Sequence, residues 1–237
     1  METKNLGPLR CRIVRKGAAR EGNLTVVLLH GFGAPGDDLA GLADVIPFPD
    51  GSTLVFPEAL HDMVDLAGPM YRGARAWWMI DMARLEVAIN TGAIRDLTNE
   101  VPDGLAEARS AVIAMLDALD AKRLVLGGFS QGAMLSLDVA LRDSKRNIEG
   151  LVLMSGTLVA EREWTPLMKA RAGLPVFQSH GTADPILPYQ IAEKLRDTLT
   201  REGLNVTFER FAGGHGIPPA VMARLGEWFS LLTSSDR

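Results

Sequence analysis

Short, unbroken runs of apolar residues recur along this chain, and most of them end at a glycine or a proline. Runs that are apolar at every position, rather than at every second position, are typical of strands buried on both faces of a parallel sheet under helices. The sequence therefore predicts a mostly parallel central sheet. The predicted strands cover residues 24–30, 52–56, 123–126, 151–154, 174–179 and 206–211.

Helical patterns occupy the intervals between these strands. Apolar side chains recur every three or four positions between residues 105 and 119, which places them on one face of a helix. Alternation of strand and helix is typical of an α/β fold with right-handed crossovers and helices on both faces of the sheet. Since no repeat or linker interrupts the chain, residues 1–237 are predicted to form one domain. The predicted helices cover residues 105–119, 133–141, 188–199 and 220–231.

Composition and charge exclude several classes of protein. Of the 237 residues, 47% are apolar and 23% are charged, the balance of an ordinary globular chain. The net charge of −4 comes from 25 basic and 29 acidic residues without a basic cluster, which argues against nucleic acid as a partner. The single cysteine excludes an internal disulfide, and no apolar stretch suits a signal peptide or a spanning helix. We therefore expect a cytoplasmic protein without stable membrane insertion.

A Gly-x-Ser-x-Gly motif at residues 128–132 carries the main functional signal. It follows one predicted strand and leads into a predicted helix. A serine in a sharp strand-to-helix turn presents its hydroxyl above the sheet, and the flanking glycines let neighbouring backbone pass closely. Roughly 0.1 such motifs arise by chance in a chain of this length, so an inactive glycine-rich turn is the alternative. The strand and the helix on either side favour Ser130 as a nucleophile.

A serine nucleophile needs a histidine base, and the base needs a carboxylate that orients it. In a turn of this kind the chain order is serine, acid, histidine. His215 lies on a glycine-rich loop after the last predicted strand, whereas His180 ends a strand and is interpreted as structural. Asp184 lies just past a strand end and is the predicted acid, with an Asp-Pro turn as the alternative. The other acids considered fall on or beside helices: Asp138, Asp143 and Asp197.

Acyl transfer also needs hydrogen-bond donors for the oxyanion that develops on the substrate. The backbone N–H of Gln131, directly after the serine, is one candidate. The second is the backbone N–H of Phe32, which lies in a glycine-rich loop at the end of the predicted strand over residues 24–30. An ordinary glycine-rich turn is the alternative for this loop.

These motifs resemble the phospholipase/carboxylesterase family of α/β-hydrolases, small esterases related to acyl-protein thioesterases. The stretches that carry the resemblance are residues 30–33, 128–133, 180–188 and 214–215, in this order. The resemblance implies an α/β-hydrolase fold, a triad of Ser130, Asp184 and His215, and an oxyanion hole formed by the N–H groups of Phe32 and Gln131. It also implies hydrolysis of esters or thioesters without a cofactor and, in many members, a homodimer.

Residues 59–101 interrupt the alternation of strands and helices and are rich in tryptophan and methionine. Within it, residues 70–90 depart from the usual family pattern, and we expect the whole segment to form an irregular wall or flap over the substrate pocket. Arg72, Arg75 and Arg84 are interpreted as solvated residues in preference to ligands for an anionic group. The predicted pocket residues are Trp77, Trp78, Ile186, Leu187 and Ile217.

The sequence thus predicts a serine carboxylesterase or thioesterase, with lysophospholipids among the substrates considered. The expected partner is a small-molecule ester or thioester, and neither a cofactor nor a metal ion is required, since no zinc, phosphate-loop or calcium motif is present. The alternatives are a non-catalytic binding protein on the same fold and a small peptidase.

Overall fold

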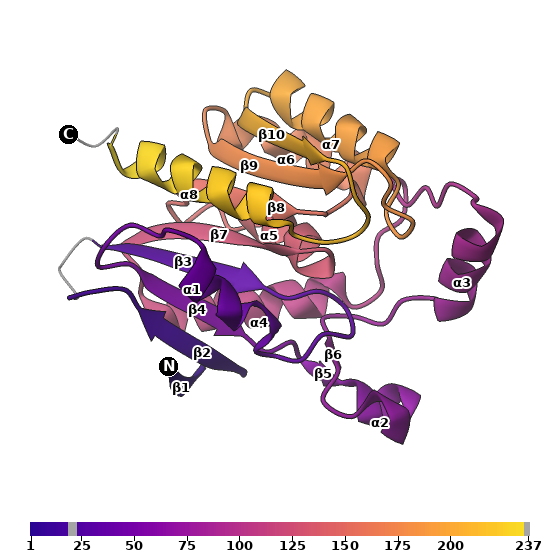
Figure 1. The fold of residues 1–237 in the computed structure, drawn as a ribbon, viewed down its shortest axis with the longest axis horizontal. Coiled ribbons are helices and arrows are strands. Elements are labelled where there is room, and N and C mark those ends of the chain that lie inside the picture. The colour runs from indigo at the N-terminus through magenta and orange to yellow at the C-terminus, as the bar shows by residue number, and fades with distance from the viewer. Residues whose placement is uncertain (19–22, 235–237) are drawn as a thin grey trace.

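The computed structural model describes residues 1–18 and 23–234. Within this part of the chain, eight strands form one sheet in the order β1-β2-β4-β3-β7-β8-β9-β10 (Figure 1). The six strands β4, β3, β7, β8, β9 and β10 run parallel, whereas β2 pairs antiparallel with both β1 and β4. The strands are β1 (Glu2–Leu6), β2 (Leu9–Arg15), β3 (Leu24–Leu29), β4 (Thr53–Pro57), β7 (Arg123–Phe129), β8 (Gly150–Met154), β9 (Pro175–Gly181) and β10 (Asn205–Phe211).

Helices cover both faces of the sheet, and each face has its own apolar core. Successive residues of a strand point to opposite faces, so Val27 and Leu29 of β3 join one core while Val26 and Leu28 join the other. The first core lies under α4 (Leu105–Leu119), α5 (Gln131–Arg142), α6 (Glu161–Met168) and α7 (Tyr189–Arg201). The second lies under α1 (Leu42–Val45) and α8 (Pro219–Ser234).

The predicted fold class is confirmed, and each strand and helix predicted from the sequence is present within a few residues of its expected bounds. The structure adds β1, β2, α3, α6 and several short elements that lie outside the predicted ranges. Strand β1 is one of these because four of its five residues are exposed, which leaves no apolar run to recognise. Among the described residues, no helix is long and apolar enough to cross a membrane.

The segment over residues 59–101 lies beyond the carboxyl ends of the parallel strands, beside the loops that follow β3 and β7 (Figure 1). It is partly helical, and a two-strand ladder anchors its base. Its longest helix, α3, presents mostly exposed side chains, with Leu85 as its buried residue. Its elements are β5 (His61–Asp62), α2 (Met63–Ala67), β6 (Arg75–Ala76) and α3 (Met82–Thr91).

Candidate active site

Ser130 lies in the turn between β7 and α5 in a conformation that side chains rarely adopt. Its φ is 55° and its ψ is −117°, and its backbone N–H donates to the Met154 carbonyl of the neighbouring strand at 2.8 Å. A positive φ at a residue other than glycine costs roughly 1–3 kcal/mol and persists only where surrounding contacts hold it. Here the hydrogen bond to β8 and the following helix hold the turn. The strained backbone conformation is therefore part of what positions the Ser130 hydroxyl.

The two glycines of the motif are required because the backbone of Leu29 passes very close to both of them. A Cβ atom at Gly132 would lie 2.0 Å from the Leu29 carbonyl oxygen, and one at Gly128 would lie 2.4 Å from the same oxygen. No side chain fits at such distances from a backbone atom. The helix after Ser130 can therefore start directly against the end of β3, which places Ser130 next to the Gly31 loop.

Asp184 lies on the loop after β9, and its carboxylate is held in one orientation. Its Oδ1 accepts the backbone N–H groups of Ile186 at 2.9 Å and of Leu187 at 3.0 Å. The loop itself is tied to the loop after β10, because the Thr182 N–H donates to the Phe211 carbonyl at 2.9 Å. This contact between the two loops brings Asp184 close to His215, although the two residues are 31 positions apart in the sequence.

His215 contacts the other carboxylate oxygen of Asp184. The distance between His215 Nδ1 and Asp184 Oδ2 is 2.7 Å, that of a strong charge-assisted hydrogen bond. Burial acts to raise the pKa of Asp184, but hydrogen bonds from His180 and His215 outweigh it and hold the pKa well below its usual range. The acid is therefore ionised and directs His215 to carry its proton on Nδ1, which leaves Nε2 as an acceptor.

His180 shares the same carboxylate oxygen but is placed differently. Its Nε2 lies 3.2 Å from Asp184 Oδ2 and 2.9 Å from the Leu187 carbonyl, so this nitrogen carries the proton and serves two acceptors. The His180 side chain is fully buried and does not line the cavity that Ser130 lines. His180 thus helps to orient the Asp184 carboxylate from the buried interior, away from the cavity.

His30 is likewise a structural residue. Its Nε2 accepts the Ala59 N–H at 3.1 Å, so its Nδ1 carries the proton and donates to the Gly31 carbonyl at 2.8 Å. Burial lowers the pKa of His30, which keeps the ring neutral. The ring therefore fixes the end of β3 and the loop that contains Phe32.

Two backbone N–H groups beside Ser130 are available to a ligand. Gln131 begins α5, and the first N–H groups of a helix have no partner within it. Within the described chain, neither the Gln131 N–H nor the Phe32 N–H makes a hydrogen bond, whereas the next residue of the loop, Gly33, donates to the Arg75 carbonyl at 2.9 Å. Both residues line the same cavity as Ser130.

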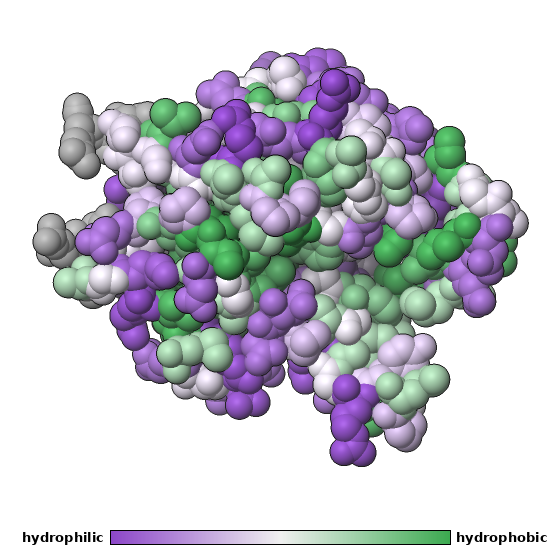
Figure 2. Space-filling model, in the orientation of Figure 1, coloured by the Kyte–Doolittle hydropathy of each residue, from purple (hydrophilic) through white to green (hydrophobic). Residues whose placement is uncertain are grey.

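That cavity, called here the Ser130 cavity, has a volume of about 330 Å³ and is bounded by the sheet edge on one side and by the 59–101 segment on the other. Apolar surface also continues around α3 on the outside of the molecule (Figure 2). Ser130 and His215 both line the cavity, although no hydrogen bond between them is formed among the described residues. Its apolar lining includes Phe32, Trp78, Met79, Ile80, Leu85, Leu97, Val101, Phe129, Met134, Val159, Ile186 and Leu187.

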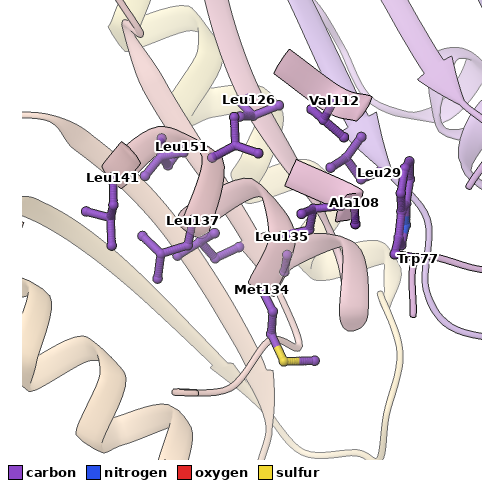
Figure 3. Packing of buried hydrophobic residues seen from close by; sticks show 14 of the residues in the cluster. Leu29, Trp77, Ala108, Val112, Leu126, Met134, Leu135, Leu137, Leu141 and Leu151 are labelled. Atoms are coloured by element: carbon purple, nitrogen blue, oxygen red, sulfur yellow. The ribbon is translucent and has the colours of Figure 1, made fainter. Parts of the chain in front are cut away.

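The structure places the five predicted pocket residues in two groups. Trp78, Ile186 and Leu187 line the Ser130 cavity, whereas Trp77 and Ile217 do not. Ile217 is partly buried against the core under α8. Trp77 faces the core beside Leu29 and Ala108 (Figure 3), and its indole N–H donates to the His30 carbonyl at 3.0 Å. Both tryptophans are buried in the core under α4 and α5, and of the two only Trp78 also lines the cavity.

Gln131 connects the serine turn to this pair of tryptophans through its side chain. Its amide oxygen accepts the Trp77 N–H at 3.0 Å, and its amide nitrogen donates to the Trp78 carbonyl at 2.8 Å. The Gln131 side chain is buried, so both bonds are shielded from water. The sequence predicted a role for the Gln131 backbone but not this one for its side chain, because the partners lie 53 and 54 residues away.

Several lining residues were not predicted from the sequence. Met134 follows Ser130 by four residues on α5, and this helical spacing could have identified it. Arg95 and Glu100 lie in the loop after α3, where no local pattern distinguishes them from solvated residues. Within residues 1–18 and 23–234, no group of three or more His, Cys, Asp or Glu side chains is arranged to hold a metal ion.

The chain is similar to a described family over most of its length. Residues 10–233 match the model of the phospholipase/carboxylesterase family. Acyl-protein thioesterase 1 of Debaryomyces hansenii is 30% identical over 211 residues, which are 82% of this chain and 84% of that protein. Acyl-protein thioesterase 1 of Candida albicans is 28% identical over 204 residues, with 79% and 82% of the two chains covered.

Solved structures share the fold. A Zea mays acyl-protein thioesterase 2 superposes with a TM-score of 0.73 at 24% identity, over 94% of this chain and 98% of that chain. The esterase PE8 superposes with a TM-score of 0.72 at 24% identity, over 94% and 99%. At this identity the likeness establishes the α/β-hydrolase architecture.

Proposed function

Because the chain belongs to the phospholipase/carboxylesterase family, we propose that it cleaves carboxylic esters or thioesters through an acyl-enzyme formed on Ser130. Family membership makes the chain an enzyme of the esterase and thioesterase class, and the proposal concerns the groups that carry out the reaction. The observation that carries it is the 2.7 Å contact between Asp184 and His215 at the cavity that Ser130 also lines.

In the proposed acylation, Ser130 Oγ attacks the carbonyl carbon of the substrate and its proton passes to His215 Nε2. Asp184 holds His215 in the tautomer that makes Nε2 the acceptor, and it stabilises the imidazolium that forms. His215 then returns the proton to the leaving alcohol or thiol as the bond to the carbonyl carbon breaks. In deacylation a water molecule attacks the acyl-enzyme in the same way, and Ser130 recovers its proton.

The backbone N–H groups of Phe32 and Gln131 are proposed to bind the oxyanion of both tetrahedral intermediates. Neither group has a partner in the described chain, and both lie beside hydrogen-bonded backbone, since the Gly33 N–H donates to the Arg75 carbonyl and the Ala133 N–H to the Ser130 carbonyl. Donors that are fixed in advance need no reorganisation as charge develops, and one such donor is worth about 10²–10³ in kcat. His30 supports this arrangement because it fixes the Gly31 carbonyl on one side of the Phe32 peptide.

The proposed substrates carry an acyl chain of limited length. The volume of about 330 Å³ lies near the lower end of ligand cavities, which span roughly 300–1,000 Å³. Trp78, Leu85, Leu97 and Met134 offer an apolar wall for the chain. The acyl-protein thioesterases among the relatives support thioesters as candidates beside oxygen esters, and lysophospholipids belong to the same proposal.

The Ser130→Ala variant tests the proposal. Release of nitrophenolate from a 4-nitrophenyl ester and of thiol from an acyl thioester should fall by about 10⁴-fold or more. The melting temperature should not fall, since the hydroxyl makes no hydrogen bond among the described residues and the strained turn stays in place. Ser136→Ala is the matched control, because that serine lies on the helix that follows Ser130 but donates to the Gly132 carbonyl and does not line the cavity. Activity retained in Ser130→Ala contradicts the proposal.

A further inference from the structure

Arg95 is an arginine without a partner in the wall of the Ser130 cavity. A guanidinium carries five N–H donors, yet within the described chain none of those of Arg95 meets an acceptor, and its Nε is fully buried. Every other described arginine that is not exposed meets a carboxylate or carbonyl oxygen, as Arg109 does at Asp138. Arg72, Arg162 and Arg210, which also lack partners, are exposed to solvent.

The loop that carries Arg95 is held in place. The Asp96 carboxylate accepts the Thr98 N–H at 2.9 Å, and the Thr98 carbonyl accepts the Glu161 N–H at 2.8 Å. The Glu100 carbonyl accepts the Ala160 N–H at 2.8 Å, which ties the loop to the start of α6. Arg95 is thus presented to the cavity from anchored backbone, and its lack of a partner is not the result of a free chain end.

The charged residues around Arg95 are already engaged with one another. Arg84 pairs with Glu100 at 2.7 Å, and the Asp81 carboxylate accepts the Arg84 N–H at 2.9 Å as the cap of α3. Half-burial and the nearby positive charge of Arg84 lower the pKa of Arg95, which indicates that its charge is poorly compensated. A buried polar group without a partner needs an explanation, and an anion in the cavity would provide one.

We infer that Arg95 binds an anionic group of the substrate, and that the preferred esters or thioesters carry a free carboxylate, as the monoesters of dicarboxylic acids do. This inference rests on the proposed function, since Ser130 and Arg95 are taken to act on one substrate molecule. The planar guanidinium matches a carboxylate with two parallel hydrogen bonds. A single negative charge fits better than the two of a phosphate group, because Asp38 and Asp103 line the same cavity and repel excess charge.

The test compares 4-nitrophenyl monoesters of adipic and suberic acid with the same compounds capped as methyl esters. The wild type should prefer the free acids in kcat/KM by about 10- to 100-fold, the usual worth of charge-assisted hydrogen bonds. Arg95→Gln should remove this preference by lowering kcat/KM for the free acids toward the value for the capped esters. Arg95→Lys should restore part of it. Arg72→Gln is the matched control, since Arg72 lies in the same segment but outside the cavity. This variant should leave kcat/KM unchanged for both the free and the capped esters.

The melting temperature separates binding from a structural role. Removal of a half-buried charge without a partner should leave the melting temperature of Arg95→Gln unchanged or raise it. If Arg95→Gln lowers the melting temperature and the rates of both substrates equally, Arg95 is structural and the inference is wrong. If the wild type has a higher kcat/KM for an ester that bears a phosphonate than for one that bears a carboxylate, the inference that Arg95 binds a singly charged carboxylate is wrong.

Failure of the inference can be told from failure of the proposed function. If the wild type hydrolyses free and capped esters equally and Ser130→Ala hydrolyses neither, the inference fails while the proposed function stands. If Ser130→Ala retains hydrolysis of the capped esters, the proposed function itself fails, and the inference with it.

Discussion

Two histidines meet one carboxylate oxygen of Asp184, and their surroundings decide what each can do. His215 makes one hydrogen bond, through Nδ1, and lines the cavity. His180 is fully buried and uses its Nε2 proton on two acceptors. Only a histidine with a free nitrogen at the cavity can take a proton from a substrate or a nucleophile.

His215→Ala is therefore expected to lower kcat by about 10³-fold or more and to lower the melting temperature less than His180→Ala does, because His215 is partly exposed and makes a single hydrogen bond. His180→Ala is expected mainly to lower the melting temperature, because it removes two buried hydrogen bonds, and to lower kcat less, through Asp184. Steady-state kinetics of both variants on one ester, with melting curves, provide the measurement. The opposite ranking of kcat would make His180 the base.

Asp184 also links stability to pH. Its pKa is lowered in the folded protein, so its ionised form contributes stability that is fully present above its unfolded pKa near 3.9 and is lost as pH falls through the folded pKa. Asp184→Asn should cost about 2 kcal/mol of unfolding free energy at pH 7 and less at pH 3. Urea unfolding at both pH values measures this, with the exposed Asp197→Asn as control. A cost that grows on acidification would contradict the assigned ionisation.

At the scale of single residues, chain order and a local motif restrict the choice of candidate groups. They predict Ser130, Asp184 and His215, and the structure brings the last two into contact. Sequence reasoning missed Arg95 and the Gln131 side chain, because their significance depends on partners, or on a lack of partners, that only the folded chain defines. A half-buried arginine and a solvated one are identical in sequence.

At the scale of elements, continuous apolar runs located the buried strands, because burial on both faces leaves a strong pattern. The same rule could not locate β5 and β6, which have two residues each, or α3, whose face toward the body buries only Leu85. The apolar pattern also could not predict which of the two tryptophans in the 59–101 segment lines the cavity. That depends on the amide of Gln131, which fixes the backbone of Trp77 and Trp78.

This arrangement predicts different effects for the two tryptophans. Trp78→Ala should enlarge the Ser130 cavity and move the preferred acyl chain to greater length. Trp77→Phe keeps most of the ring volume but leaves the His30 carbonyl without its donor, so it should cost about 1–3 kcal/mol of stability and leave the preferred length unchanged. Melting curves and rates on a 4-nitrophenyl ester series check both. An altered chain-length profile in Trp77→Phe alone would reverse the assignment.

At the scale of the whole molecule, the topology explains why distant segments meet in one cavity. Parallel strands end at the same edge of the sheet, and ligand sites in such sheets lie outside their carboxyl ends. The loops after β3, β7, β9 and β10 supply Phe32, Ser130, Asp184 and His215 from that edge. The 59–101 segment, which lies beyond that edge (Figure 1), bounds the cavity opposite the proposed reactive groups and contributes Trp78, Leu85 and Leu97 to its lining.

The central claim is that Ser130 is the nucleophile, and covalent labelling tests it most directly. A fluorophosphonate reacts with an activated serine, and mass spectrometry of the digested protein identifies the modified residue. The account predicts one adduct, on Ser130, that is absent from Ser130→Ala and greatly slowed in His215→Ala, where the base is missing. An unlabelled wild type, or an adduct on any other residue, would contradict it.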